Sequence, residues 1–134
     1  MSGHSLNFVG PVNGMEVYAS RDIVQAEIIG NPRIKHLVRF IGLLKELCDV
    51  FKLPTNAVHV FYDPVGESIA FNRDRALFFN LHFYESLHGS DGEKWSSDSM
   101  IYWFFSFCHE LAHNFVKVHN SEHEVSFYKE LVVI

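Results

Sequence analysis

The chain has 134 residues, is 48% hydrophobic and carries a net charge of −5. This length predicts a single domain with its own hydrophobic core. The acidic balance without a Lys/Arg cluster argues against a nucleic-acid partner and favours a basic peptide or protein partner. No apolar run approaches the ~20 residues of a membrane span, and the N-terminus lacks the layout of a signal peptide. We therefore expect no membrane association and an intracellular protein, cytoplasmic or nuclear.

The first thirty residues contain a turn pattern, Pro11-Val12-Asn13-Gly14, between two β-prone runs. This pattern predicts a hairpin or an extended N-terminal arm. Asn31-Pro32 then predicts a helix start, with Asn as the cap and Pro at the first helical position. Apolar residues follow at three- and four-residue spacing as far as Phe51, and we expect Pro54 to end the helix.

Three β-prone segments come next: residues 58–62, 68–72 and 76–84. We expect them to form a small sheet. Ser96, Ser97 and Asp98 predict the capped start of a second long helix, on which we expect an apolar face. That face comprises Ile101, Phe104, Phe105, Cys108, Leu111, Ala112 and Phe115. Ser121 and Glu124 have the spacing of a capping box for a closing helix through Val132.

The fold class predicted from this order is α+β, with a sheet of three or more strands between helices. The domain spans residues 1–134, and because the chain stops in an apolar run, ELVVI, it could be one domain of a longer protein. Cys48 and Cys108 lie within apolar helical patterns, which predicts buried thiols in a reducing compartment. Nothing in the sequence predicts the oligomeric state.

Residues 107–124, FCHELAHNFVKVHNSEHE, contain the pattern H-E-x-x-H. Two histidines four residues apart project from one face of a helix, so His109 and His113 can bind one zinc ion. Glu110 is offset from His109 by about 100° and can reach a water molecule on that ion. We therefore assign Glu110 as the general base, with a carboxylate that only orients a ligand as the alternative.

The third ligand is left open by the sequence. Catalytic zinc usually takes three protein ligands and one water. His119 is favoured, His123 is its rival, and a carboxylate of Glu122 or Glu124 is a further alternative. If both histidines bound at once, the site would be closed and structural. Tyr128 or the unused histidine could stabilise an oxyanion.

Other polar residues carry weaker expectations. The strand before the motif helix, with Asn80 and His82 on one face, could be an edge that binds an extended peptide, although core packing of both residues is favoured. Cys108 adjoins His109 but faces away from it on the helix, and we expect it to pack in the core.

HELAHNFVKVH resembles the active helix of zincin metallopeptidases, and the order of helix, sheet, motif helix and further helix is similar to the minimal zincin core. Within the zincins, H-E-L-x-H-N followed by His119-Asn120 resembles the WLM and SprT-like group, small proteases of DNA-linked proteins. In that group a Phe is expected where this chain has His123. A fainter resemblance, in IAFNR, LFFNL and HELAHN, is to the C-terminal domain of large eukaryotic proteins that carry a histidine-kinase-like ATPase module.

These observations predict a zinc metalloendopeptidase with Zn²⁺ as its cofactor and a peptide or protein as its substrate. Two alternatives are a non-catalytic, zinc-stabilised interaction domain of a larger protein and a zinc hydrolase with a non-peptide substrate. A structural site has no need of a base such as Glu110, which favours the peptidase.

Overall fold

The computed structural model describes residues 5–92 and 94–118, which form a five-stranded mixed sheet and its helices. The elements are β1 (Leu6–Val12), β2 (Met15–Ser20), α1 (Gln25–Ile29), α2 (Arg33–Phe51), η1 (Thr55–Ala57), β3 (Val58–Tyr62), β4 (Ala70–Arg73), β5 (Ala76–Asn80), α3 (Leu81–His88) and α4 (Ser97–Val118). The predicted α+β class is confirmed. In the described part of the chain, no helix combines the length and apolar character needed to cross a membrane.

The N-terminal segment forms a hairpin that belongs to the main sheet. Asn13 and Gly14 have φ values of 49° and 84°, as a two-residue turn with two left-handed positions requires. β2 then pairs in parallel with β3, with Val17 opposite Val60. The hairpin is therefore confirmed, and its two strands enlarge the sheet to five strands, in agreement with the expected three or more.

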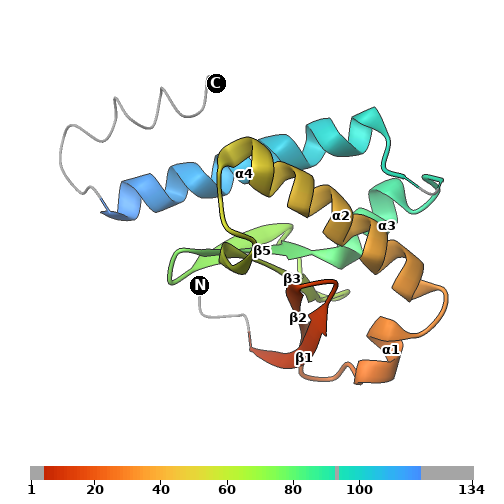
Figure 1. Ribbon diagram of the computed structural model, residues 1–134. Coiled ribbons are helices and arrows are strands. Elements are labelled where there is room, and N and C mark those ends of the chain that lie inside the picture. The colour runs from red at the N-terminus through yellow and green to blue at the C-terminus, as the bar shows by residue number, and fades with distance from the viewer. Residues whose placement is uncertain (1–4, 93, 119–134) are drawn as a thin grey trace.

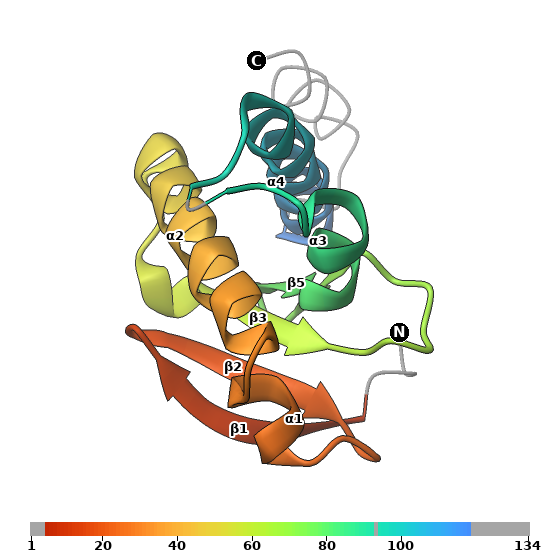
Figure 2. The ribbon, with the colours of Figure 1, turned by 90° about the vertical axis from the view of Figure 1, so that its right-hand side faces the viewer.

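The strand order is β1-β2-β3-β5-β4, so β4 and not β5 lies at the sheet edge beside the last helix. β3 pairs in parallel with β5, and β4 pairs antiparallel with β5. α2 and α4 lie over the same face of this sheet (Figures 1 and 2). The core between them is strongly aromatic: the Phe79 ring on β5 stacks on Phe107 of α4 at a centroid distance of 4.6 Å.

The other face of the sheet is covered by side chains of the strands themselves. Phe71 and Phe78 stack with centroids 4.6 Å apart, and the Arg73 guanidinium lies 5.2 Å from the Phe71 ring centre. All five residues of β3 are consequently buried, which explains why the strand shows no apolar-polar alternation.

The main differences from the sequence predictions are two element boundaries and one additional helix. α2 begins at Arg33, with Pro32 rather than Asn31 at the cap position. The third predicted strand ends at Asn80, because the Asn80 side chain accepts a hydrogen bond from the His82 backbone N–H at 3.0 Å and so caps α3. The short helix α1 was not predicted.

Candidate metal and peptide-binding site

α4 begins at a polar cap that the sequence predicts correctly. The Ser96 hydroxyl accepts a hydrogen bond from the Ser99 backbone N–H at 3.1 Å. The Asp91 carboxylate accepts from the Ser96 N–H at 2.9 Å and from the Ser99 hydroxyl at 2.6 Å. Burial raises the pKa of Asp91, but these hydrogen bonds outweigh it and leave that pKa below its usual value. The N-terminus of the helix is thereby fixed.

One face of α4 is buried in the core, and another is exposed. Trp103 and Phe107 are fully buried in the core that α4 forms with the sheet and α2, and Ala112 is also fully buried. Ile101 and Phe105, which the sequence placed on the buried face, are 55% and 60% exposed. Their assignment to the core was wrong, because the core face is centred on Trp103 and Phe107, and both residues lie about 140–180° around the helix from it, on the opposite face.

His109 and His113 lie on an exposed strip of α4, and the structure brings them together. Their Nε2 atoms are 3.0 Å apart, and their ring centroids 4.5 Å apart. Two nitrogens that share a tetrahedral zinc ion at ~2.05 Å are about 3.3 Å apart. A movement of a few tenths of an ångström in exposed side chains would therefore admit the ion, and the pair fits zinc.

Glu110 lies beside this pair but is 6% exposed. Its backbone carbonyl accepts a hydrogen bond from Asn72 Nδ2 of β4 at 3.4 Å. One helical turn further on, Asn114 Nδ2 donates to the Arg75 carbonyl at 3.5 Å. The edge strand β4 and its turn thus run alongside the motif, and the Glu110 backbone is at the junction between strand and helix.

A cavity of about 810 Å³ opens from His109 and Glu110 along α4. We call it the α4–β4 groove. Its lining residues are Glu67, Ile69 and Ala70 from the segment entering β4, His88 from α3, and Asp98, Ile101, Tyr102, Phe105, Ser106, His109 and Glu110 from α4. A volume of this size is typical of ligand sites. The α4 members are spaced by three and four residues, a pattern visible in the sequence and not used there.

Asn80 and His82 do not form the peptide-binding edge that the sequence left open as an alternative to core packing. Asn80 is completely buried at the end of an interior strand, and His82 lies on α3. The Asn80 amide accepts from the Asp63 N–H at 3.1 Å and donates to the carbonyls of Asp63 and Ser68 at 3.1 and 3.0 Å. Asn80 therefore holds the loop that leads to the groove wall, and core packing, the favoured alternative, is confirmed for it.

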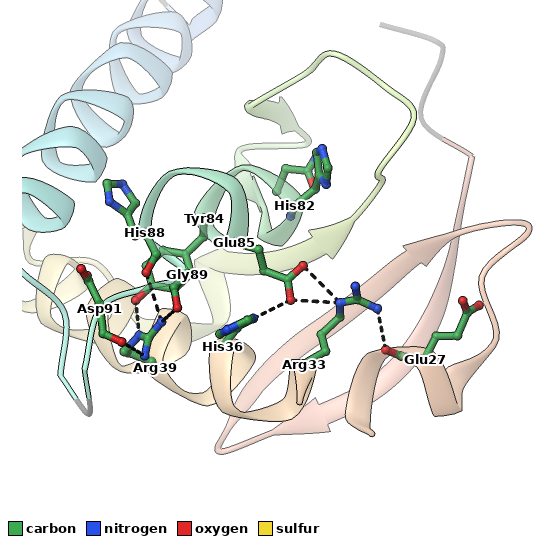
Figure 3. A network of polar contacts seen from close by, with 11 residues as sticks. Glu27, Arg33, His36, Arg39, His82, Tyr84, Glu85, His88, Gly89 and Asp91 are labelled. Carbon is green, nitrogen blue, oxygen red and sulfur yellow. Dashed lines mark hydrogen bonds and ion pairs between the residues drawn. The ribbon is translucent and has the colours of Figure 1, made fainter. Parts of the chain in front are cut away.

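α3 is attached to α2 by a network of polar contacts (Figure 3). Glu85 Oε2 accepts a hydrogen bond from Arg33 Nε at 3.0 Å, and the same oxygen lies 2.8 Å from His36 Nδ1. Arg39 donates to the Tyr84 hydroxyl at 2.7 Å, to the carbonyl of His88 at the end of α3 and to the carbonyl of Asp91 in the loop after it. These contacts fix the C-terminal end of α3 and the loop before α4.

His88 is a groove residue that the sequence did not single out. It is 8% exposed, and its Nε2 has no hydrogen-bond partner among the described residues. Burial lowers the pKa of His88, and the Asp91 and Asp98 carboxylates oppose this effect only in part. The lowered pKa favours the neutral imidazole. The ring points from the end of α3 toward α4 (Figure 3).

The remaining site predictions fall outside the described residues. His119, His123, Glu122, Glu124, Tyr128 and the closing helix all belong to this group. Within residues 5–92 and 94–118, no third His, Cys, Asp or Glu joins a cluster that could hold a metal ion. Cys108 is buried in the core as predicted, and burial raises the pKa of its thiol.

Comparison of the chain with models of protein families, with curated proteins and with solved structures gives no significant match. The functional assignment therefore depends on the residues and their geometry.

Proposed function

We propose that this protein is a zinc-dependent metallopeptidase. The observation that carries the proposal is the convergence of His109 and His113, with Nε2 atoms 3.0 Å apart, next to a buried Glu110 at the end of a groove. Two imidazoles, a carboxylate one residue from the first, and a cavity beside them are the parts that this chemistry needs. A pair of structural histidines would not require the groove.

His109 and His113 would hold the ion through Nε2. A third ligand, His119 or His123, or less favourably Glu122 or Glu124, would complete the set from the segment after α4. When bound, zinc supplies Lewis acidity, which polarises a peptide carbonyl and makes water acidic enough to react near neutral pH.

Glu110 would act as the general base. Its carboxylate oxygens would take a proton from the attacking water and pass it to the nitrogen of the leaving amine. The low exposure of Glu110 keeps bulk water away from this transfer. The groove would hold the peptide, and the edge strand β4 offers backbone groups along which an extended chain can lie.

Two measurements test the proposal. Protein purified without added zinc should contain close to one zinc per chain, and His109→Ala and His113→Ala should each lose it. Glu110→Gln should keep the zinc and lose peptide cleavage by at least ~100-fold, the usual contribution of a general base. Cleavage that survives Glu110→Gln would reject the base assignment.

The third ligand and the non-catalytic alternative are separated by further variants. Zinc affinity is measured for His119→Ala and His123→Ala. Substitution of the true ligand should weaken zinc binding by orders of magnitude, whereas substitution of the other histidine should leave zinc binding nearly unchanged. If the wild-type protein binds zinc and unfolds on chelation but cleaves no peptide in a broad library, the ion is structural and the peptidase proposal fails.

A further inference from the structure

The α4–β4 groove is long enough for several residues of an extended peptide. On α4 it runs from Asp98 to Glu110, and twelve residues of helix span about 18 Å. An extended chain rises about 3.3 Å per residue, so about five residues fit along this length. The groove therefore has one end at the proposed catalytic residues and another, remote end near the start of α4.

Two carboxylates gather at the remote end. Asp98 lies in the first turn of α4. The contacts of Asn72 with Glu110 and of Asn114 with Arg75 show that the strand segment and α4 advance in the same direction. Glu67, five residues before Asn72, consequently lies back toward Asp98. Among the described residues that line the groove there is no lysine or arginine.

His88 adds a second and independent feature to this end. It lines the groove, its ring centroid is 5.7 Å from that of Tyr102, and it interacts electrostatically with Asp98. Its Nε2 is buried without a hydrogen-bond partner in the described part of the chain. A buried polar nitrogen of this kind usually has a partner. In the neutral tautomer that is protonated on Nδ1, Nε2 is an acceptor, and the remote end is then suited to a ligand that carries a hydrogen-bond donor.

The walls between the two ends are apolar. Ile101 and Phe105 are 55% and 60% exposed on α4, and Ile69 faces them from the segment that enters β4. Such surfaces can bury a hydrocarbon stem. A purely apolar side chain would offer no hydrogen bond to the His88 nitrogen and no positive charge to the two carboxylates. An acidic side chain would be repelled by Glu67 and Asp98.

We propose that the remote end of the groove binds an arginine or lysine side chain of the peptide substrate, about five residues from the bond that is cut. The stem packs on Ile101 and Phe105, the charged head lies between Glu67 and Asp98, and one of its N–H groups donates to His88 Nε2. This inference rests on the proposed peptidase function, because it names the substrate class of the same groove. The net charge of −5 also favours a cationic peptide.

The test uses the full chain loaded with zinc and a fluorogenic peptide in which arginine is moved one position at a time. Citrulline, the uncharged isostere of arginine, is the matched control at each position. At one remote position, arginine should raise kcat/KM about tenfold over citrulline, as expected for a partly desolvated ion pair. Glu67→Gln combined with Asp98→Asn should bring this ratio close to one.

The control is the double variant Glu46→Gln with Asp49→Asn, on the exposed side of α2. It changes the net charge by the same amount as the Glu67/Asp98 double variant and should preserve the arginine preference. Binding of the same peptides to the Glu110→Gln protein, measured by fluorescence anisotropy, gives a readout without catalysis. His88→Phe should weaken arginine binding and leave citrulline binding less affected, and a thermal melt verifies that each variant folds.

The outcomes separate the two proposals. Cleavage without arginine preference, or a preference that survives the Glu67/Asp98 change, overturns this inference and leaves the peptidase function intact. Arginine-dependent binding that is lost in the double variant, together with no cleavage of any peptide, supports the groove and rejects the peptidase. Absence of both cleavage and arginine-dependent binding overturns both.

Discussion

Asn80→Ala should be among the most destabilising substitutions of a polar residue in the described part of the chain. The Asn80 side chain makes four hydrogen bonds with backbone groups: it accepts from the N–H groups of Asp63 and His82 and donates to the carbonyls of Asp63 and Ser68. These bonds join the end of β3, the loop before β4 and the start of α3. The side chain is fully buried, so water cannot replace it without a structural change.

The magnitude follows from these bonds. At about 1 kcal/mol of net stability for each hydrogen bond, their loss lowers the free energy of unfolding by about 4 kcal/mol. Partial relaxation of the loop reduces this value, and the cavity left by the amide increases it, so we expect about 3–5 kcal/mol. This is a large fraction of the stability of a domain of this size.

Urea denaturation of the wild-type protein and the variant measures the difference. Asn56→Ala, at an exposed position in η1, is the control and should change stability by less than about 0.5 kcal/mol. Hydrogen exchange of the Asp63 and His82 amides adds a local readout, because both should lose protection in Asn80→Ala. A loss below about 1 kcal/mol with both amides still protected would refute the assignment of Asn80 as the link between these segments.

Two further predictions concern the polar contacts around α3. Arg39→Lys should lower the free energy of unfolding, measured by urea denaturation, by about 2–4 kcal/mol. Lysine cannot form hydrogen bonds with the Tyr84 hydroxyl and with the carbonyls of His88 and Asp91 at the same time. Arg21→Lys, at an exposed position, is the control and should be nearly neutral. Burial lowers the pKa of His59 and His88 below the unfolded value of about 6.5, so below that pH the unfolded chain binds protons more readily and stability should fall. Chemical denaturation between pH 7.5 and 5.5 should therefore show a weaker pH dependence in His88→Gln than in the wild-type protein, and an unchanged dependence would contradict the burial effect.

The sequence predicts elements whose cause is local. The turn at Asn13-Gly14, the periodicity of α2 and the serine cap of α4 depend on a few neighbouring residues, and the structure contains all three. The predicted third strand extends to Tyr84 because residues 81–84 are β-prone, although Leu81, Tyr84 and His88 have helical spacing and all three are buried. The cap formed by Asn80 decides in favour of the helix.

The groove could not be predicted in the same way. Glu67, His88 and Asp98 come from three separate segments and line the same groove only because β5 is placed between β3 and β4 and α3 returns toward α4. This strand order depends on packing between distant segments, which no local pattern encodes. The histidine pair and Glu110 were predictable because a single helix carries all three.

The core also fixes the direction in which that helix presents its functional residues. Phe107, two residues before His109, stacks on Phe51 and Phe79 at centroid distances of 5.4 and 4.6 Å. Rotating α4 by one residue, about 100°, would expose Phe107 and Trp103, each of which contributes about 2–3 kcal/mol by burial. The rotation needed to turn Glu110 away from the groove is therefore opposed by the aromatic core. Rigid placement of this kind is what a metal-dependent hydrolase requires of a base that must meet a water molecule within a few tenths of an ångström.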